Sequence, residues 1–109
     1  MMKSRLDVII ESRTAERAVK AKRLAAELIR ALREMGLDAS VIGSLAKGEF
    51  RLHSDIDILV KGPVDGVMRG EVDRIVRRAL IGSRIGCDIV YLEDLPDDRR
   101  AEFDAIVHA

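Results

Sequence analysis

The chain has 109 residues, no net formal charge and few aromatic residues, with no Trp, one Tyr and two Phe. This length predicts a single domain over residues 1–109, with a modest core and no second substrate-binding lobe. Balanced charge and few stacking rings argue against binding of extended DNA or RNA, although one nucleotide remains possible. The sequence has no run of membrane-spanning length and no signal-peptide pattern, so we expect a cytoplasmic protein with no membrane partner.

The first third of the chain is predicted to be helical. Ser4 and Asp7 have the spacing of a helix start, which indicates a short leading turn. A long helix is predicted from Thr14 to Met35, because its apolar residues recur on one stripe with charges opposite. Gly36 is a typical residue to end such a helix.

The rest of the chain alternates short apolar segments with helical patterns. The predicted elements are, in order, a strand at 39–43, a helical turn and loop, a strand at 55–60, a helix at 67–80, a strand at 84–92 and a helix from 97. This order predicts an α/β (α+β) fold, with a small mixed or antiparallel sheet of about three strands and helices packed on one face.

The most informative stretch is GSLAKGEFRLHSDID, residues 43–57, where a Gly-Ser pair precedes two aspartates one residue apart. Asp55 and Asp57 lie two apart in a predicted strand, so both carboxylates project from one face. Gly43 lets backbone approach a phosphate closely, and Ser44 is expected to cap the next helical turn and aim N–H groups at anionic oxygens. Such a cradle beside paired carboxylates suits a Mg²⁺-bound nucleotide.

The two halves of this motif meet only in one strand arrangement. Antiparallel neighbours would bring the end of strand 39–43 and the start of strand 55–60 to the same end of the sheet. A parallel pair would separate them by roughly 16 Å, the length of a five-residue strand. We therefore predict the antiparallel pair. The alternative is a solvent-facing edge strand whose acidic residues discourage aggregation.

A third carboxylate is expected where a two-metal site also orients an attacking hydroxyl. Asp88 is the best candidate, because it lies inside an otherwise apolar strand where an unpaired charge is costly. Asp65 and Asp94 are poorer candidates, since solvated aspartate is ordinary in turn-like sequence. Lys47 is either a point charge for the terminal phosphates or a solvated loop lysine. His53 is interpreted as a bystander, although contact with the nucleotide remains open.

The stretch GSLAKGEFRLHSDIDILV resembles the signature of the DNA polymerase β-type nucleotidyltransferase superfamily, and the short chain is similar to its minimal nucleotidyltransferase branch. The resemblance implies that Gly43 and Ser44 hold the β- and γ-phosphates of ATP. It implies that Asp55 and Asp57 bind two Mg²⁺ ions, and that Asp88 completes the metal site. Asp88 would also help to deprotonate an acceptor hydroxyl, which attacks the α-phosphate as pyrophosphate leaves.

Within the minimal branch, the chain resembles MntA-type antitoxins, which are paired with small helical HEPN toxins of an RNase class. This resemblance implies transfer of AMP from ATP onto a tyrosine of the partner toxin. Two alternatives stay open: a non-catalytic antitoxin that blocks its partner sterically, and transfer to a small-molecule hydroxyl. Three converging carboxylates favour the enzyme, because binding alone does not need them.

Overall fold

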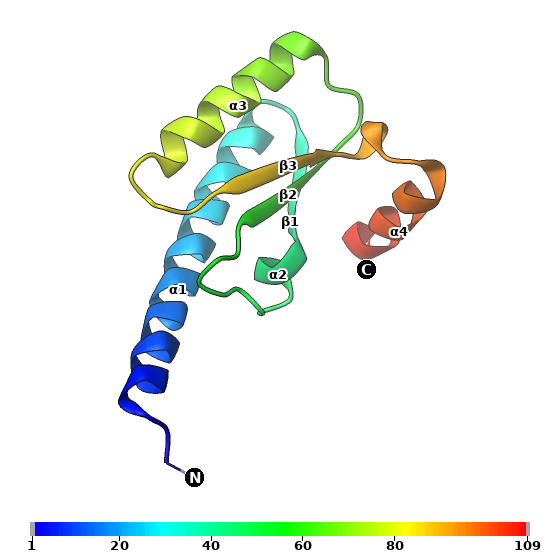
Figure 1. Cartoon of the computed structure of the whole chain (residues 1–109). Helices are drawn as coiled ribbons and strands as arrows, with labels where there is room; N and C mark the ends of the chain where they lie inside the picture. Colours follow the sequence, from blue (N-terminus) through cyan, green and yellow to red (C-terminus); the bar gives the residue numbers. More distant parts are fainter. Residues whose placement is uncertain (1, 109) are drawn as a thin grey trace.

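The computed structural model describes residues 2–108 of the chain, with side chains described for residues 2–103. Its elements are α1 (Arg5–Glu34), β1 (Asp38–Ile42), α2 (Gly43–Ala46), β2 (Ile56–Lys61), α3 (Gly66–Leu80), β3 (Cys87–Tyr91), the 3-10 turn η1 (Leu92–Asp94) and α4 (Asp97–His108). Figure 1 shows the long helix α1 running past the sheet, with α4 apart from α1 and α3. Within the described residues, no helix combines the length and apolarity needed to cross a membrane.

The predicted helix start at Ser4 and Asp7 is confirmed, but it begins α1 itself, so the predicted start of the long helix at Thr14 is wrong. Ser4 and Asp7 form a capping box: the Ser4 hydroxyl accepts the Asp7 N–H at 3.0 Å, and the Asp7 carboxylate accepts the Ser4 N–H at 3.2 Å. Because no glycine or proline follows within the helix, the turn that this box starts continues without a break. The predicted end at Gly36 is confirmed by its left-handed φ of 85°.

The sheet has the strand order β1-β2-β3, with β1 antiparallel to β2 and β2 parallel to β3. The antiparallel pair that the motif requires is therefore confirmed. Asp57 lies opposite Ile42 of β1 and opposite Asp88 of β3 in the strand register. Since Gly43 directly follows Ile42, this register brings the Gly-Ser turn and two of the predicted site aspartates to one end of the sheet.

The main core lies between one face of the sheet and the helices α1 and α3. Ile56, Ile58 and Val60 alternate along β2 and are fully buried, as the strand pattern predicts. They pack against apolar side chains of both helices, among them Leu28 of α1 and Val72 of α3. Burial of this face fixes the strand register, because a shift by one residue would turn every apolar side chain outward.

The opposite face of the sheet carries a smaller apolar cluster of Ile42, Leu59 and Leu92. Phe103 of α4 packs against this cluster. The prediction of helices on one face is thus met by α1 and α3, whereas α4 contacts the second face. By strand alternation, Asp57 points to the same face as Leu59. The candidate site therefore lies on the face that α1 and α3 leave open.

Strand β3 is shorter than the predicted segment 84–92. Arg84 has a positive φ of 62°, which a strand residue does not adopt, and Leu92 already belongs to η1. The strand begins only at Cys87, which packs partly buried against the main core. As a result, Asp88 is the second residue of its strand, near the same end of the sheet as the start of β2.

Candidate functional site

Gly43 begins α2 and lies against the carboxylate of Asp57. Its φ of 73° is left-handed, and a Cβ placed on it would overlap Asp57 Oδ2 and lie 3.1 Å from Asp57 Cγ. Glycine alone meets both conditions, because it tolerates this backbone conformation and leaves the space to the carboxylate. The close approach joins the predicted phosphate-binding turn to a predicted metal ligand.

The turn α2 places Ser44 inside a helix rather than at its cap. The N-cap is Ile42, which makes no side-chain hydrogen bond, so the prediction that Ser44 caps the turn is wrong. The carbonyl of Ser44 accepts the N–H of Glu49 at 2.8 Å, which closes the following loop. The first N–H groups of a helix have no intrahelical partner. The first N–H groups of α2 therefore have no partner within this helix, which begins next to Asp57.

Asp55 lies just before β2 and against Gly86, which lies just before β3. A Cβ on Gly86 would come within 2.7 Å of Asp55 Oδ1 and 3.1 Å of its Cγ. The Ile56 N–H donates to the Gly86 carbonyl at 2.9 Å, so the beginnings of the two strands are joined. Sequence reasoning missed Gly86, because its contact with Asp55 exists only through the parallel pairing of β2 with β3.

Asp57 is partly buried and lies near two other negatively charged carboxylates. Burial first, and then the charges of Asp88 and Asp55, raise the pKa of Asp57 above its ordinary value of 3.8. Each of these influences disfavours the ionised carboxylate, and a nearby cation would favour it. Three oxygen donors with mutual repulsion are the ligand set that hard divalent cations such as Mg²⁺ accept. The side chains present therefore fit a divalent metal.

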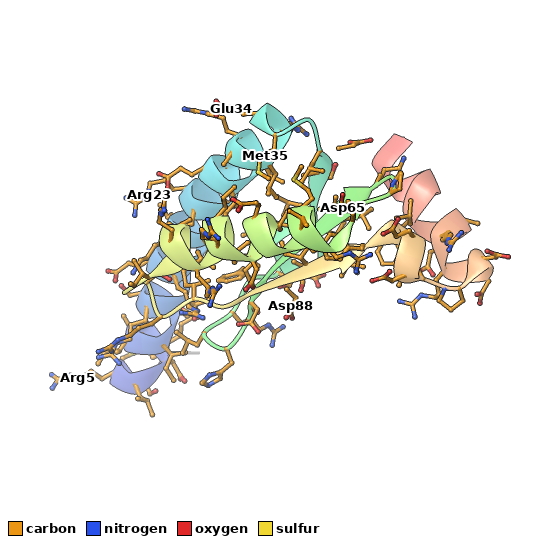
Figure 2. The ribbon with its side chains drawn as sticks, turned by 90° about the horizontal axis from the view of Figure 1, so that it is seen from above. Arg5, Arg23, Glu34, Met35, Asp65 and Asp88 are labelled. Carbon is orange, nitrogen blue, oxygen red and sulfur yellow. The ribbon has the colours of Figure 1, made fainter. Side chains whose placement is uncertain are left out.

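Asp88 lies directly opposite Asp57 in the register and is exposed to solvent. The sequence argument that its charge is costly inside an apolar strand is therefore wrong, although its place beside Asp57 agrees with the predicted role. Figure 2 shows Asp88 on β3, away from Asp65 at the start of α3. Among the described residues, no group of three His, Cys, Asp or Glu side chains is already arranged to hold a metal ion.

The two alternative third carboxylates are engaged in other contacts. Asp65 caps α3, where its side chain accepts the Met68 N–H at 2.8 Å. Asp94 pairs with Arg69 at 2.6 Å, and this hydrogen bond lowers the pKa of Asp94. Both carboxylates thus have structural partners, whereas Asp88 faces other carboxylates. The contacts favour Asp88 as the third site residue.

Lys47 and His53 lie in different surroundings. Lys47 follows α2 and lines, together with Gly43, a cavity of about 370 Å³ between β1, α2 and α4. His53 lines a separate groove of about 900 Å³ with Ile10 of α1. The structure therefore brings Lys47, rather than His53, to the Gly-Ser turn.

The structure is an α/β domain whose three-stranded mixed sheet carries a glycine turn and facing aspartates at one end. The family model described as "Nucleotidyltransferase domain" matches residues 21–105. The chain belongs to this family, whose general activity is nucleotidyl transfer with a nucleoside triphosphate and a divalent metal. Comparison with curated proteins and with solved structures gave no match.

Proposed function

We propose that this chain is a Mg²⁺-dependent adenylyltransferase that transfers AMP from ATP to a tyrosine hydroxyl of a helical HEPN-class toxin, and that it acts as the antitoxin of that toxin. The observation that carries this proposal is that Asp57 lies against Gly43 and opposite Asp88, where burial and then the charges of Asp88 and Asp55 raise the pKa of Asp57. A surface that only blocks a partner gains nothing from carboxylates that repel one another.

The Gly-Ser turn is proposed to hold the β- and γ-phosphates. Gly43 and Ser44 contribute backbone N–H donors and a hydroxyl, and Lys47 contributes a positive charge for the terminal phosphates. Asp55 and Asp57, completed by Asp88, are proposed to hold two Mg²⁺ ions. Bound there, the ions would polarise the α-phosphate and neutralise the charge that develops on it.

The proposed reaction is an in-line displacement at the α-phosphorus. The acceptor oxygen forms a bond to this phosphorus, while the bond to the oxygen bridging the α- and β-phosphates breaks. Pyrophosphate leaves with the electron pair, and Asp88 takes the proton of the acceptor hydroxyl. Asp88 is exposed on a strand at the border of the sheet, which leaves room for an acceptor as large as a protein side chain.

The test is co-expression of the chain with the protein encoded beside its gene, followed by the intact mass of that neighbour. We expect a gain of one or more whole AMP units with the wild-type chain and no gain with Asp57→Asn. Asp65→Asn is the matched control, because Asn can also cap α3 and so leaves the site unchanged.

Two other outcomes would contradict the proposed transfer to a toxin. An unmodified neighbour that still co-purifies with the chain would favour a steric antitoxin. A neighbour that is neither modified nor bound would favour a small-molecule hydroxyl as the acceptor.

A further inference from the structure

Arg17 of α1 spans the two loops that lead into the candidate site. Its Nη1 donates to the carbonyl of Arg84 at 2.9 Å, and its Nη2 donates to the carbonyl of Ser54 at 3.1 Å. Ser54 directly precedes Asp55, and Arg84 lies two residues before Gly86, against which Asp55 packs. One side chain outside residues 43–57 thus connects both segments whose contact sets the position of Asp55.

The surroundings of Arg17 hold its guanidinium in place. Its Cζ lies 5.6 Å from the ring centroid of Phe50, which is buried in the main core. The Nε atom is buried without a hydrogen-bond partner in the described part of the chain. Arg84, one of the two acceptors, has the left-handed φ of 62°, which is uncommon for a residue with a side chain. The two loop carbonyls and the buried Phe50 ring therefore fix the position of the guanidinium, although its Nε has no hydrogen-bond partner among the residues that the structure describes.

We propose that Arg17 is a positioning residue for the metal site, which holds the segments 54–55 and 84–86 together and so keeps Asp55 close to the strands that carry Asp57 and Asp88. This inference rests on the proposed function, since Arg17 has this role only if the carboxylates bind a metal. Its planar guanidinium can donate to two acceptors in a fixed geometry, whereas a lysine ammonium offers a single point of charge. The hydrogen bonds to two loops use this property directly.

Lys20, one helical turn further along α1, offers a matched comparison. Its Nζ donates to the carbonyl of Ser83 at 3.0 Å. Lys20 therefore contacts the loop before β3, as Arg17 does, and Arg17 alone of the two is hydrogen-bonded to Ser54 in the described contacts. Loss of Lys20 removes a hydrogen bond to one loop, whereas loss of Arg17 removes hydrogen bonds to two loops.

The test uses Mn²⁺ as the probe and measures its affinity for the nucleotide-free protein by electron paramagnetic resonance. Loss of a residue that supports metal ligands typically weakens metal affinity 10–100-fold, so we expect the Mn²⁺ Kd to rise at least about tenfold in Arg17→Met and to change less than about twofold in Lys20→Met. The Mn²⁺ Kd of Arg17→Lys should lie between those of Arg17→Met and Lys20→Met. Amide hydrogen exchange at residues 54–58 of the metal-free protein should also be faster in Arg17→Met than in Lys20→Met.

The Mg²⁺ dependence of nucleotide transfer gives a second readout. We expect Arg17→Met to need more Mg²⁺ for half-maximal rate, and to recover to within about threefold of the wild-type rate at saturating Mg²⁺, because the cation then draws the carboxylates together. Equal Mn²⁺ affinities in Arg17→Met and Lys20→Met would overturn the role of Arg17. If Arg17→Met does not fold, the Mn²⁺ affinity of Arg17→Lys is compared with that of Lys20→Met instead, and equal affinities would again overturn the role of Arg17.

Failure of the proposed function has a different signature. A wild-type chain that neither binds Mn²⁺ nor transfers a nucleotide would contradict the metal site itself, and the role of Arg17 with it. A wild-type chain that does both, while Arg17→Met and Arg17→Lys behave like wild type in both, would contradict the role of Arg17 alone.

Discussion

Gly43 packs against the Asp57 carboxylate so closely that a methyl group in its place would overlap the Asp57 Oδ2 atom. The contact follows from the register, which sets Asp57 opposite Ile42, the residue directly before Gly43. The same glycine has a φ of 73°, which residues with a Cβ rarely adopt. The Gly-Ser turn and the Asp57 carboxylate therefore depend on each other, and a change in one should disturb the other.

Gly43→Ala should abolish most of the nucleotide transfer, with Gly48→Ala as its control. Gly48 has nearly the same φ, 74°, but has open space where a Cβ would lie. Each replacement should lower the free energy of unfolding by roughly 1–2 kcal/mol through the strained backbone. Displacement of Asp57 should cost Gly43→Ala at least about 100-fold in rate, since small misplacements of reacting groups can have this effect.

The comparison is made by steady-state transfer at saturating Mg²⁺ together with urea unfolding of both variants. The control should stay within about threefold of the wild-type rate, because its added methyl group contacts nothing near the site. Equal losses of rate in the two variants would mean that backbone strain, and not contact with Asp57, explains the effect.

Asp88→Asn should remove activity without removing the fold. If Asp88 binds the metal as proposed, its loss should cost several kcal/mol of transition-state stabilisation, or about 100-fold or more in rate. Thermal unfolding should stay close to wild type, because Asp88 is exposed and Asn has nearly its shape. Asp65→Asn is the control and should retain the wild-type rate. An unchanged rate in Asp88→Asn would falsify its assignment to the site.

Arg69 should matter for stability and not for metal binding. Its guanidinium donates to Glu93 and Asp94, each at 2.6 Å, and its Cζ lies 3.9 Å from the Tyr91 ring centroid. Arg69→Lys keeps the charge but loses the two-pronged donor geometry and the flat stacking surface. We expect a lower Tm with an unchanged Mn²⁺ affinity, because these contacts hold the segment after β3.

Arg74→Lys provides the control for Arg69→Lys. Arg74 makes an exposed ion pair with Glu71 at 3.2 Å, and such pairs contribute little to stability. Its Tm should therefore equal that of the wild type in a thermal scan by circular dichroism. A similar Tm in the two variants, or a loss of Mn²⁺ affinity in Arg69→Lys, would contradict the purely structural role of Arg69.

The site could be predicted from the sequence where the signal is local. The alternation in SDIDILV correctly placed Ile58 in the core and Asp57 on the other face, and the Gly-Ser turn correctly required an antiparallel pair. Residues with distant partners gave no such signal. Gly86 matters only once β2 and β3 pair in parallel, and the acceptors of Arg17 lie 37 and 67 residues away along the chain. Those acceptors are backbone carbonyls, which no residue type reveals.

Asp57→Asn should stabilise the metal-free protein at neutral pH while it removes metal binding. Burial and the charges of Asp88 and Asp55 raise the pKa of Asp57 in the fold. A carboxyl group with a raised pKa binds its proton more tightly in the folded state, so its ionisation weakens the fold. This penalty is absent below the ordinary pKa of 3.8, grows as pH rises, and is complete above the raised pKa.

The measurement is the Tm of wild type and Asp57→Asn in EDTA and in Mg²⁺ from pH 3 to pH 7. In EDTA, the variant should be more stable at pH 7, and the difference should vanish toward the acid end. Mg²⁺ should raise the Tm of the wild type only, because a ligand stabilises the state that binds it.

Asp94→Asn should change the stability of the fold in the opposite direction, which makes it the control for the removal of a charge alone. Its hydrogen bond with Arg69 lowers the pKa of Asp94, so ionised Asp94 stabilises the fold above pH 3.8. The variant should be less stable than wild type at pH 7, with the deficit fading as pH falls through the lowered pKa. A metal-free Asp57→Asn protein that is also less stable at pH 7 would mean that its carboxylate is stabilised by a partner in the fold, and the three-carboxylate site would have to be abandoned.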